Sequence, residues 1–270
     1  MNMITVNICT WNRAKLLDQT LKSMTKLSVP DGIQWELIIV DNNSTDNTSE
    51  VIDHYSTLLP VKKVFERRQG KCYALNTMLS KASGKYIIFT DDDVLVDRRW
   101  LSAYVDAFNQ YPDAVYFGGP VKPLFEKPPP KWMQENLQEF SIPFAILDPH
   151  NYANYVLGMN DYVIGANMAF LKKVFQTREF DCKLGHRGDQ IVGGEEIEIL
   201  KEVKAADLKG VWVGKAITTH FIVKERMTLA SLFNSFGRKG RVDCIKRIRL
   251  AAAEGKRIFN VPTWVSECYS

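Results

Sequence analysis

The sequence predicts an α/β fold in which helices flank a mostly parallel β-sheet. Two observations support this prediction. Short runs rich in Ile and Val alternate with helix-like segments through the first third of the chain. Polar residues follow each run directly, at the positions where the carboxyl ends of parallel strands form the ligand-binding edge of such a sheet. The 270 residues, 46% of them hydrophobic, are enough for one large domain or two small ones.

Four apolar runs are predicted as strands buried on both faces of the sheet, with three helices between them. The predicted strands are Ile4–Cys9, Glu36–Val40, Val61–Phe65 and Tyr86–Thr90, and the helices lie near 12–25, 46–57 and 71–81. Thr45 or Asp46 is the expected cap of the second helix, because both residue types accept hydrogen bonds from a first helical turn.

The pattern changes beyond residue 115. Five prolines between Gly119 and Trp132 exclude a continuous helix or a central strand, so this stretch is predicted as a loop over the site. A glycine-rich loop at Lys183–Gly194 leads into a helix near Glu195–Asp207, and Ala216–Phe221 is predicted as a late strand.

The end of the chain is predicted as an amphipathic helical segment that carries much of the basic surplus. Leu229, Leu232, Phe233 and Phe236 recur at helical spacing, and Lys and Arg follow through 238–257. This region is either a solvated helix packed on the domain or a patch that holds the protein on an anionic membrane surface, and we favour the second. We therefore expect a domain at 1–225, with a nucleotide-binding half at 1–115 and an acceptor half at 116–225, and a basic helical extension at 226–270.

Composition narrows the function classes. The net charge of +4 is too small to indicate a nucleic-acid partner. Five scattered cysteines without a CxxC pair favour a reducing, cytoplasmic setting. We expect neither a signal peptide nor a membrane-spanning segment, because the chain opens with a strand-like run and contains no stretch of about 20 apolar residues.

Asp91, Asp92 and Asp93 form the strongest chemical signal, because adjacent carboxylates at a strand end repel one another unless a cation neutralises them. A divalent metal, Mn²⁺ or Mg²⁺, is the simplest such cation, and it typically bridges one or two carboxylates to substrate phosphates. Asp91 and Asp93 make a DxD pattern. The alternative is a solvated acidic turn that caps the following helix.

Two further polar residues stand at predicted helix or strand ends. Asp41 can accept a hydrogen bond from a nucleotide base, or it can simply form an Asx turn. Lys71 follows Gly70 at the start of a predicted helix, where it can reach phosphate or base, although a solvated lysine is the default interpretation.

Glu195 and Glu196 follow Gly194, and either can act as a general base toward a hydroxyl group. The alternative is that acidic residues in a first helical turn only stabilise the helix dipole. His220 closes the predicted late strand and can supply a nitrogen ligand to a metal at Asp93, although a lone histidine is more often structural.

Together these motifs resemble family 2 of the inverting glycosyltransferases, which have the Rossmann-like GT-A fold. The match runs nearly end to end, and the order and spacing of the motifs make it specific. The matching residues are Thr10 to Arg13, Ile38 to Asp46, Gly70-Lys71 through Ala74-Leu75-Asn76, Thr90 to Asp93, Gly165-Ala166-Asn167, Gly194-Glu195-Glu196, and His220 ahead of Arg226.

The resemblance implies an enzyme that transfers a sugar, with inversion, from a nucleotide diphosphate donor to a hydroxyl acceptor. A UDP-sugar is the favoured donor, the acceptor is a glycan or a lipid-linked hydroxyl, the product is a polysaccharide or glycolipid, and Mn²⁺ or Mg²⁺ is the cofactor. Such an enzyme is expected in the cytoplasm, held peripherally on the inner face of the cell membrane.

The resemblance also assigns roles to individual residues. Thr10, Asn12, Arg13 and Asp41 are implied to line the nucleoside pocket, Asp91 and Asp92 to lie near ribose and diphosphate, Asp93 to bind the metal with His220, and Gly165, Ala166 and Asn167 to face the sugar and acceptor. The family's base is usually the second residue of a Glu-Asp pair, which is Glu196 here. Glutamate in place of aspartate lengthens the side chain by one methylene and leaves Glu195 as an alternative.

Two other functions compete with this interpretation. A sugar nucleotidyltransferase needs a glycine-rich loop after the first strand to hold triphosphate, and Thr10–Lys15 contains no glycine. A glycan-binding or scaffold protein on a degenerate fold would be expected to have lost its reactive carboxylates, yet Asp91, Asp93, Glu195 and Glu196 are all present.

Overall fold

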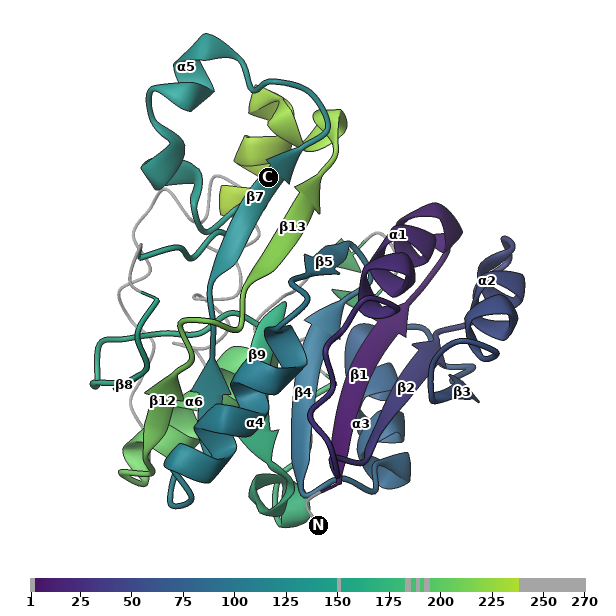
Figure 1. Cartoon of the computed structure of the whole chain (residues 1–270). Helices are drawn as coiled ribbons and strands as arrows, with labels where there is room; N and C mark the ends of the chain where they lie inside the picture. The colour runs from purple at the N-terminus through teal and green to yellow at the C-terminus, as the bar shows by residue number, and fades with distance from the viewer. Residues whose placement is uncertain (1–2, 150–151, 183–185, 188–189, 192–194, 238–270) are drawn as a thin grey trace, which may run out of the picture.

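A computed structural model of the chain describes residues 3–149, 152–182, 186–187, 190–191 and 195–237. Its centre is an eight-stranded sheet with the strand order β3-β2-β1-β4-β9-β6-β12-β8 (Figure 1). The pairs formed by β1 with β2 and β4, by β2 with β3, and by β6 with β12 are parallel, while β9 and β8 run antiparallel to their neighbours. The predicted α/β fold with a mostly parallel sheet is confirmed.

The strands of the first 115 residues lie where the apolar runs predict them. They are β1 (Ile4–Thr10), β2 (Trp35–Asp41), β3 (Val61–Phe65) and β4 (Tyr86–Asp91). β1, β2 and β4 are almost fully buried, but β3 is not, so the expectation that all four are buried on both faces is wrong for β3. β3 forms the edge of the sheet and exposes Lys62 and Lys63, charged side chains that suit an edge strand.

Three helices follow these strands, as predicted: α1 (Ala14–Met24), α2 (Thr48–Tyr55) and α3 (Lys71–Lys81). Asp46 serves two of them at once. Its Oδ1 accepts hydrogen bonds from the Thr48 amide and hydroxyl, and its Oδ2 accepts one from the amide of Ala14. One carboxylate therefore satisfies donors in the first turns of α1 and α2 and ties the two loops together.

The second half of the sheet is built from shorter strands. These are β6 (Tyr116–Gly118), β8 (Tyr155–Val156), β9 (Asn167–Leu171) and β12 (Gly210–Trp212). The α-helices α4 (Trp100–Gln110) and α6 (Glu195–Ala205) belong to the same part of the fold. In Figure 1, α4 lies across the front of the sheet. Its buried residues, Trp100, Tyr104 and Phe108 among them, belong to the main hydrophobic core.

A three-stranded sheet of order β5-β13-β7 stands above the carboxyl edge of the large sheet (Figure 1). Its strands are β5 (Val94–Val96), β7 (Val121–Phe125) and β13 (Thr218–Ile222), and the last confirms the predicted late strand. The expectation that Gly119–Trp132 is entirely loop is wrong, because it contains β7 and the start of α5 (Lys131–Gln134). Pro123 is tolerated because β7 is an edge strand.

The remaining described elements are short. They comprise the 3-10 helices Leu137–Phe140, Lys172–Gln176 and Lys224–Met227, and the paired strands β10 (His186–Arg187) and β11 (Gln190–Ile191) within the predicted glycine-rich loop. A helix covers 229–237, and the rest of the predicted basic extension lies outside the described residues. None of the helices in the described ranges has the length and apolar character needed to span a bilayer.

Candidate active site

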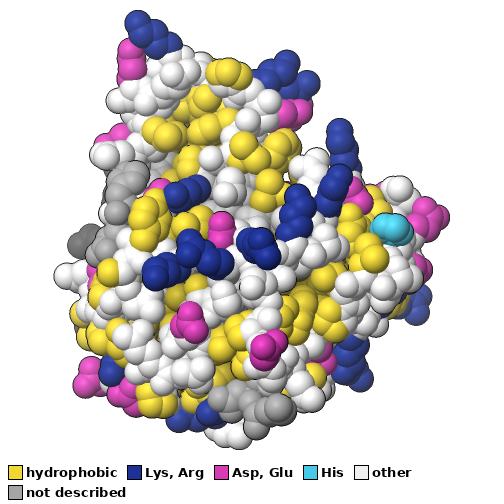
Figure 2. Space-filling model, in the orientation of Figure 1, with side chains coloured by type: hydrophobic (Ala, Val, Ile, Leu, Met, Phe, Trp, Pro, Cys, Tyr) yellow, Lys and Arg dark blue, Asp and Glu magenta, His cyan; other side chains and the backbone are white. Residues whose placement is uncertain are grey.

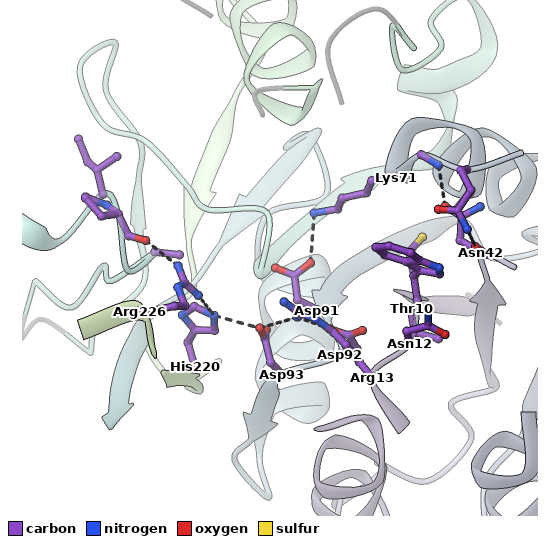
Figure 3. A pocket seen from close by; sticks show the side chains of 18 residues that line it. Thr10, Asn12, Arg13, Asn42, Lys71, Asp91, Asp92, Asp93, His220 and Arg226 are labelled. Atoms are coloured by element: carbon purple, nitrogen blue, oxygen red, sulfur yellow. Dashed lines mark hydrogen bonds and ion pairs between the residues drawn. The ribbon is translucent and has the colours of Figure 1, made fainter. Parts of the chain in front are cut away.

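A cavity of about 600 Å³ opens where β1, β2 and β4 end, below the small sheet (Figure 3). Loops from both halves of the chain meet there, as expected for ligand sites in sheets of this kind. Its lining consists of Cys9, Thr10, Trp11, Asn12, Arg13, Asn42, Gln69, Gly70, Lys71, Ala74, Asp91, Asp92, Asp93, Ile142, Pro143, Ala145, His220 and Arg226.

The loop after β1 supplies one wall of this cavity. Asn12 has a backbone φ of 51°, in the left-handed region that asparagine tolerates better than most residues. This conformation lets its Oδ1 accept hydrogen bonds from the amides of Thr45 (2.7 Å) and Asp46 (3.3 Å). Asn12 therefore both lines the cavity and fixes the loop after β1 against the loop after β2.

The three aspartates at the end of β4 are already paired with cations of the chain. The Arg13 Nη1 atom lies 2.8 Å from both Asp92 Oδ1 and Asp93 Oδ2, and the Lys71 Nζ atom lies 3.2 Å from Asp91 Oδ1. Arg13 and Lys71 therefore supply part of the positive charge that the sequence argument assigned to a metal.

Burial and neighbouring charges shift the pKa values of Asp92 and Asp93 in opposite directions. Desolvation raises the pKa of Asp92, although Arg13 opposes the shift. Burial alone would also raise the pKa of Asp93, but the hydrogen bond and charge of His220, together with the charge of Arg13, lower it. Asp93 is therefore the more strongly anionic of the two and the better cation ligand.

His220 comes from β13 and faces Asp93, which directly precedes β5, the strand that pairs with β13. Its Nε2 lies 3.4 Å from Asp93 Oδ1, and its Nδ1 lies 2.7 Å from the carbonyl oxygen of Phe144. A carbonyl can only accept, so Nδ1 donates its proton to it, which orients the ring with Nε2 toward Asp93. Metal-binding histidines use this arrangement, in which the far ring nitrogen is held by a carbonyl.

The donor set at this point fits a divalent cation that takes only part of its coordination from protein. Within the described ranges, no group of three or more His, Cys, Asp or Glu side chains is arranged to hold a metal. Asp93 and His220 supply one oxygen and one nitrogen, which leaves positions for diphosphate oxygens and water, as Mg²⁺ and Mn²⁺ commonly require.

Glu196 lies beside the cavity rather than in its lining. Its Oε1 accepts a hydrogen bond of 2.9 Å from Lys71 Nζ, the same atom that contacts Asp91, and its side chain is 15% exposed. Gly165 touches it, since a Cβ on this residue would stand 2.5 Å from Glu196 Oε1. Glu196, Gly165, Lys71 and Asp91 share a small recess that adjoins the main cavity. The side chain of Glu195 lies outside the described part of the chain.

Two of the residues implied to face sugar and acceptor serve the core. Asn167 is fully buried, and its amide binds Trp100, Tyr104, and the carbonyls of Pro120 and Ala216. Ala166 is also buried, and its carbonyl accepts from the hydroxyl of Thr90. Asn167 thus joins β9 to α4 and to the segments that enter β7 and β13, and of these three residues Gly165 is the one that lines the recess beside the cavity. The role of Ala166 and Asn167 toward sugar and acceptor stays a prediction.

Asp41 forms a turn at the end of β2, and its role toward a nucleotide base stays a prediction. It is buried at the end of β2, and its Oδ1 accepts the amide of Ser44, which matches the turn-forming alternative. It is not among the residues that line the cavity. Asn42 lines the cavity in its place, and its side chain is held by the carbonyls of Glu66 and Arg68 and by the amide of Gly70.

Several lining residues carry no strong sequence signal. Ile142, Pro143 and Ala145 enter from the excursion between β7 and β8, and only tertiary structure reveals that they reach the carboxyl edge. Arg226 donates to the Pro143 carbonyl at 2.6 Å and lies 3.4 Å from His220 Nε2. The sequence clue to Arg226 was its place six residues after His220.

Cys9 lies in the lining close to Lys71 and Asp91, where a thiolate would be a nucleophile. Burial raises the pKa of its thiol to about 12, although the charge of Lys71 opposes the shift. The thiol therefore stays protonated at neutral pH, which leaves the reactive chemistry to the carboxylates.

The sheet topology, the cavity at its carboxyl edge and the DxD carboxylates define a glycosyltransferase of the GT-A class. The family model described as "Glycosyl transferase family 2" matches residues 5–178, and the chain belongs to this family. A curated relative is the succinoglycan biosynthesis protein ExoM of Rhizobium meliloti, 24% identical over 133 residues, which are 48% of this chain and 42% of that protein. The chain thus matches less than half the length of this relative.

Solved structures show the same fold. A mannosyltransferase from Pyrobaculum calidifontis, in complex with GDP-Man and Mn²⁺, matches with a TM-score of 0.56 at 21% identity, over 80% of this chain and 56% of that one. S. aureus TarS 1–349, in complex with UDP-GlcNAc, matches with a TM-score of 0.60 at 15% identity, over 82% of this chain and 58% of that one. At these identities the likeness establishes the fold alone.

Proposed function

We propose that this family 2 enzyme moves a sugar from a nucleotide diphosphate donor to a hydroxyl acceptor, with inversion at the anomeric carbon, in the assembly of a polysaccharide or glycolipid. The observation that carries the proposal is the position of Glu196, whose carboxylate is linked through Lys71 to the DxD residue Asp91. A carboxylate that can act as a base thus stands beside the cavity that suits a diphosphate.

In this proposal the donor occupies the cavity formed mainly by residues 1–115. Arg13, Lys71 and Arg226 line it with positive charge that suits a diphosphate. The exposed indole of Trp11 offers a face on which a nucleobase can stack. A UDP-sugar is the favoured donor, and TarS, captured with UDP-GlcNAc, is a relative in fold that binds one.

The reaction needs one base and one stabilised leaving group. Glu196 takes the proton of the acceptor hydroxyl as that oxygen forms its bond to the anomeric carbon. The bond between this carbon and the diphosphate oxygen breaks on the opposite face, and its electron pair leaves with the diphosphate. Lys71 and Arg13 supply positive charge on the diphosphate side, and residues 116–225 supply Gly165 and the acceptor wall.

A divalent metal, Mn²⁺ or Mg²⁺, completes the proposed site, held by Asp93 and His220 with Asp91 nearby. When bound, it would neutralise negative charge that develops on the leaving diphosphate. The mannosyltransferase of the same fold was solved with Mn²⁺ and its donor, which supports this assignment.

The acceptor is proposed to be a glycan or a lipid-linked hydroxyl at the inner face of the cell membrane. The helix at 229–237 supports a surface contact, since Leu229, Phe233 and Phe236 are 59%, 75% and 45% exposed. Apolar side chains gather on the upper lobe in Figure 2, and in sequence the helix is followed by the basic stretch 238–257. Sedimentation with liposomes tests this: equal, weak binding with and without anionic lipid would remove the membrane from the proposal.

A thermal-shift panel with UDP, GDP, CDP and dTDP, each with Mn²⁺, with Mg²⁺ and with EDTA, tests the proposed donor site. A ligand that binds only the folded state raises its melting temperature. We expect one nucleotide, UDP, to stabilise the protein in Mn²⁺ and to lose this effect in EDTA. If no nucleotide shifts the melting temperature under any condition, the proposed donor site is wrong.

A further inference from the structure

The Ala74-Leu75-Asn76 motif ends in a residue that the donor cavity does not use. Asn76 lies on α3, which begins at the cavity with Lys71, but Asn76 is not among the lining residues. Its amide is instead matched to one distant residue. The Nδ2 group donates to the Phe180 carbonyl at 2.9 Å, and Oδ1 accepts from the Phe180 amide at 2.9 Å. A carboxamide is suited to this double contact because it offers one donor and one acceptor side by side.

The backbone that Asn76 holds is firmly placed in the core. Phe180 is 2% exposed, and its ring packs against those of Phe89 and Phe175, with centroids 5.8 Å and 5.5 Å away. Two residues later, Cys182 forms a disulfide with Cys72, and the Asn76 amide lies 3.7 Å from the Cys182 sulfur. Residues 180–182 are therefore fastened to one side of α3.

The chain returns to the same helix at Glu196. The Lys71 Nζ atom donates to Glu196 Oε1 at 2.9 Å, so the first turn of α6 is held to the first turn of α3. Cys182 and Glu196 are thus both attached to the Lys71–Asn76 stretch of α3. A direct ion pair joins the same two parts of the chain, because Arg178 Nε lies 2.7 Å from Glu202 Oε2 on α6.

We propose that Asn76 is a positioning residue: by clamping residues 180–182 to α3, it fixes the segment that contacts α6 through Arg178 and so keeps Glu196 beside the cavity. This inference rests on the proposed role of Glu196 as the base. It assigns α3 two tasks, with Lys71 facing the donor and the base, and Asn76 holding residues 180–182.

The first arm of the test does not depend on sugar transfer. The Cys72–Cys182 disulfide is reduced by two glutathione thiols, which leave as one glutathione disulfide, so its equilibrium constant reports how well the two sulfurs are held together. We expect Asn76→Leu and Asn76→Asp to shift this equilibrium about tenfold toward the thiols, the effect of losing one or two hydrogen bonds. Alkylation after acid quenching, followed by peptide mapping, measures it.

The second arm separates positioning from general destabilisation. In the two Asn76 variants we expect kcat to fall about tenfold while the Kd of UDP with Mn²⁺, measured by calorimetry, changes less than twofold. Asn136→Leu is the matched control, because it removes an amide-to-carbonyl bond (2.8 Å to Trp132) far from α3. Tyr55→Phe controls for lost stability, since it removes the bond to Asp18 between α1 and α2. Both controls should leave the disulfide equilibrium and kcat unchanged.

Three results would overturn the inference: an unchanged disulfide equilibrium in Asn76→Leu, an unchanged kcat despite a shifted equilibrium, or parallel losses of kcat, UDP affinity and melting temperature. Asn76→Asp keeps the shape of the side chain and the bond from the Phe180 amide but sets an oxygen against the Phe180 carbonyl, so it tests the clamp without a change of size should Asn76→Leu fail to fold. If the wild-type protein transfers no sugar from any donor, the proposed function fails, while the disulfide arm still decides whether Asn76 acts as a clamp.

Discussion

Gly165 leaves no room for a side chain beside Glu196. A Cβ at position 165 would stand 2.5 Å from the Glu196 carboxylate, so an alanine there must push the carboxylate aside. The obstacle is the end of a flexible side chain, and stability should therefore change little. We predict that Gly165→Ala lowers kcat by about 10- to 100-fold, in line with a base displaced by about 1 Å. Steady-state kinetics and a melting curve measure the two effects, and an unchanged kcat would contradict the assignment.

Glu196→Gln removes the proton acceptor while keeping the shape of the side chain and an oxygen for Lys71. We predict loss of transfer, by about 100-fold or more, with the Kd of UDP retained. Product formation by mass spectrometry and calorimetric titration of UDP are the measurements. Glu195→Gln is the matched control and should retain transfer, whereas activity retained in Glu196→Gln would move the base to another residue.

Asp93→Asn tests the proposed metal site separately. The neutral amide keeps the shape of the side chain but removes the anionic oxygen that faces His220. We predict that Mn²⁺ binds at least tenfold more weakly in the presence of UDP, as expected when one of few protein ligands is lost. Titration followed by electron paramagnetic resonance measures free Mn²⁺ directly. Unchanged Mn²⁺ affinity would exclude Asp93 as a ligand.

At the residue scale, sequence could locate the carboxylates but not assign their partners. The DxD motif and Glu196 are visible because acidic residues at a strand end or helix start are chemically conspicuous. Asn167 looks equally polar, yet it is fully buried and satisfied by core groups. Which polar residue faces a ligand depends on contacts such as those with Trp100 and Tyr104, far away in sequence, and a single chain does not display them.

Among the elements, the loop from β3 to α3 depends on one buried carboxylate. Glu66 accepts hydrogen bonds from the backbone and guanidinium of Arg68 and from the hydroxyl of Thr77. The bonds from Arg68 are the main cause that lowers its pKa from 4.5 to about 2, although burial opposes them. Because the folded-state pKa is the lower one, ionised Glu66 stabilises the fold above about pH 4.5, and this contribution disappears as pH falls toward 2.

We predict that Glu66→Gln costs on the order of 2 kcal/mol of unfolding free energy at pH 7. It should also flatten the pH dependence of stability between pH 4.5 and 2 relative to the wild type. Urea denaturation at a series of pH values measures both effects. A variant with the same pH dependence as the wild type would show that Glu66 has no lowered pKa.

Helices and strands were predictable where their hydrophobic residues form a clear pattern, either a continuous run or a helical spacing. β1, β2 and β4 are buried apolar runs, and α1 places Leu17, Leu21 and Met24 on one buried face. β7 was hidden because the sequence around Pro123 argues against a strand, and only its place at a sheet edge makes the proline acceptable. The exposure of β3 was not predictable either, because it follows from the place of β3 at the edge of the sheet, and strand order is a property of the assembled sheet.

For the whole molecule, the Cys72–Cys182 disulfide links positions 110 residues apart. Such a spacing gives no sequence signal, and a disulfide is unusual in the reducing setting expected from the scattered cysteines. In the chain-entropy model, a loop of this size stabilises the native state by roughly 5 kcal/mol. We predict that dithiothreitol lowers the melting temperature of the wild type but not of Cys182→Ser, as scanning calorimetry would show. Equal shifts in both proteins would contradict a stabilising disulfide.

One buried side-chain amide forms hydrogen bonds at the place where the two sheets meet. Asn167 begins β9 of the large sheet and binds the carbonyls of Pro120 and Ala216, just ahead of β7 and β13 of the small sheet. Asp93 directly precedes β5, and it faces His220 on β13 because these two strands pair in the small sheet and the Phe221 amide donates to the Asp93 carbonyl at 2.8 Å. Sequence indicated the pairing of Asp93 and His220 through the family resemblance, but not the strand pairing that enforces it.

The excursion between β7 and the large sheet leaves and returns at one place. Val121 and Leu147 exchange backbone hydrogen bonds of 2.8 and 2.9 Å, so the chain from Lys122 to Ile146 is an insertion whose two ends touch. Its exposed turns can change length at a small cost in closure entropy, while the carbonyls of Phe144 and Pro143 keep its inner part attached to His220 and Arg226. The wall of the cavity at Ile142 and Pro143 thus belongs to a module whose outer part can vary among homologues while its attachment to the small sheet is retained.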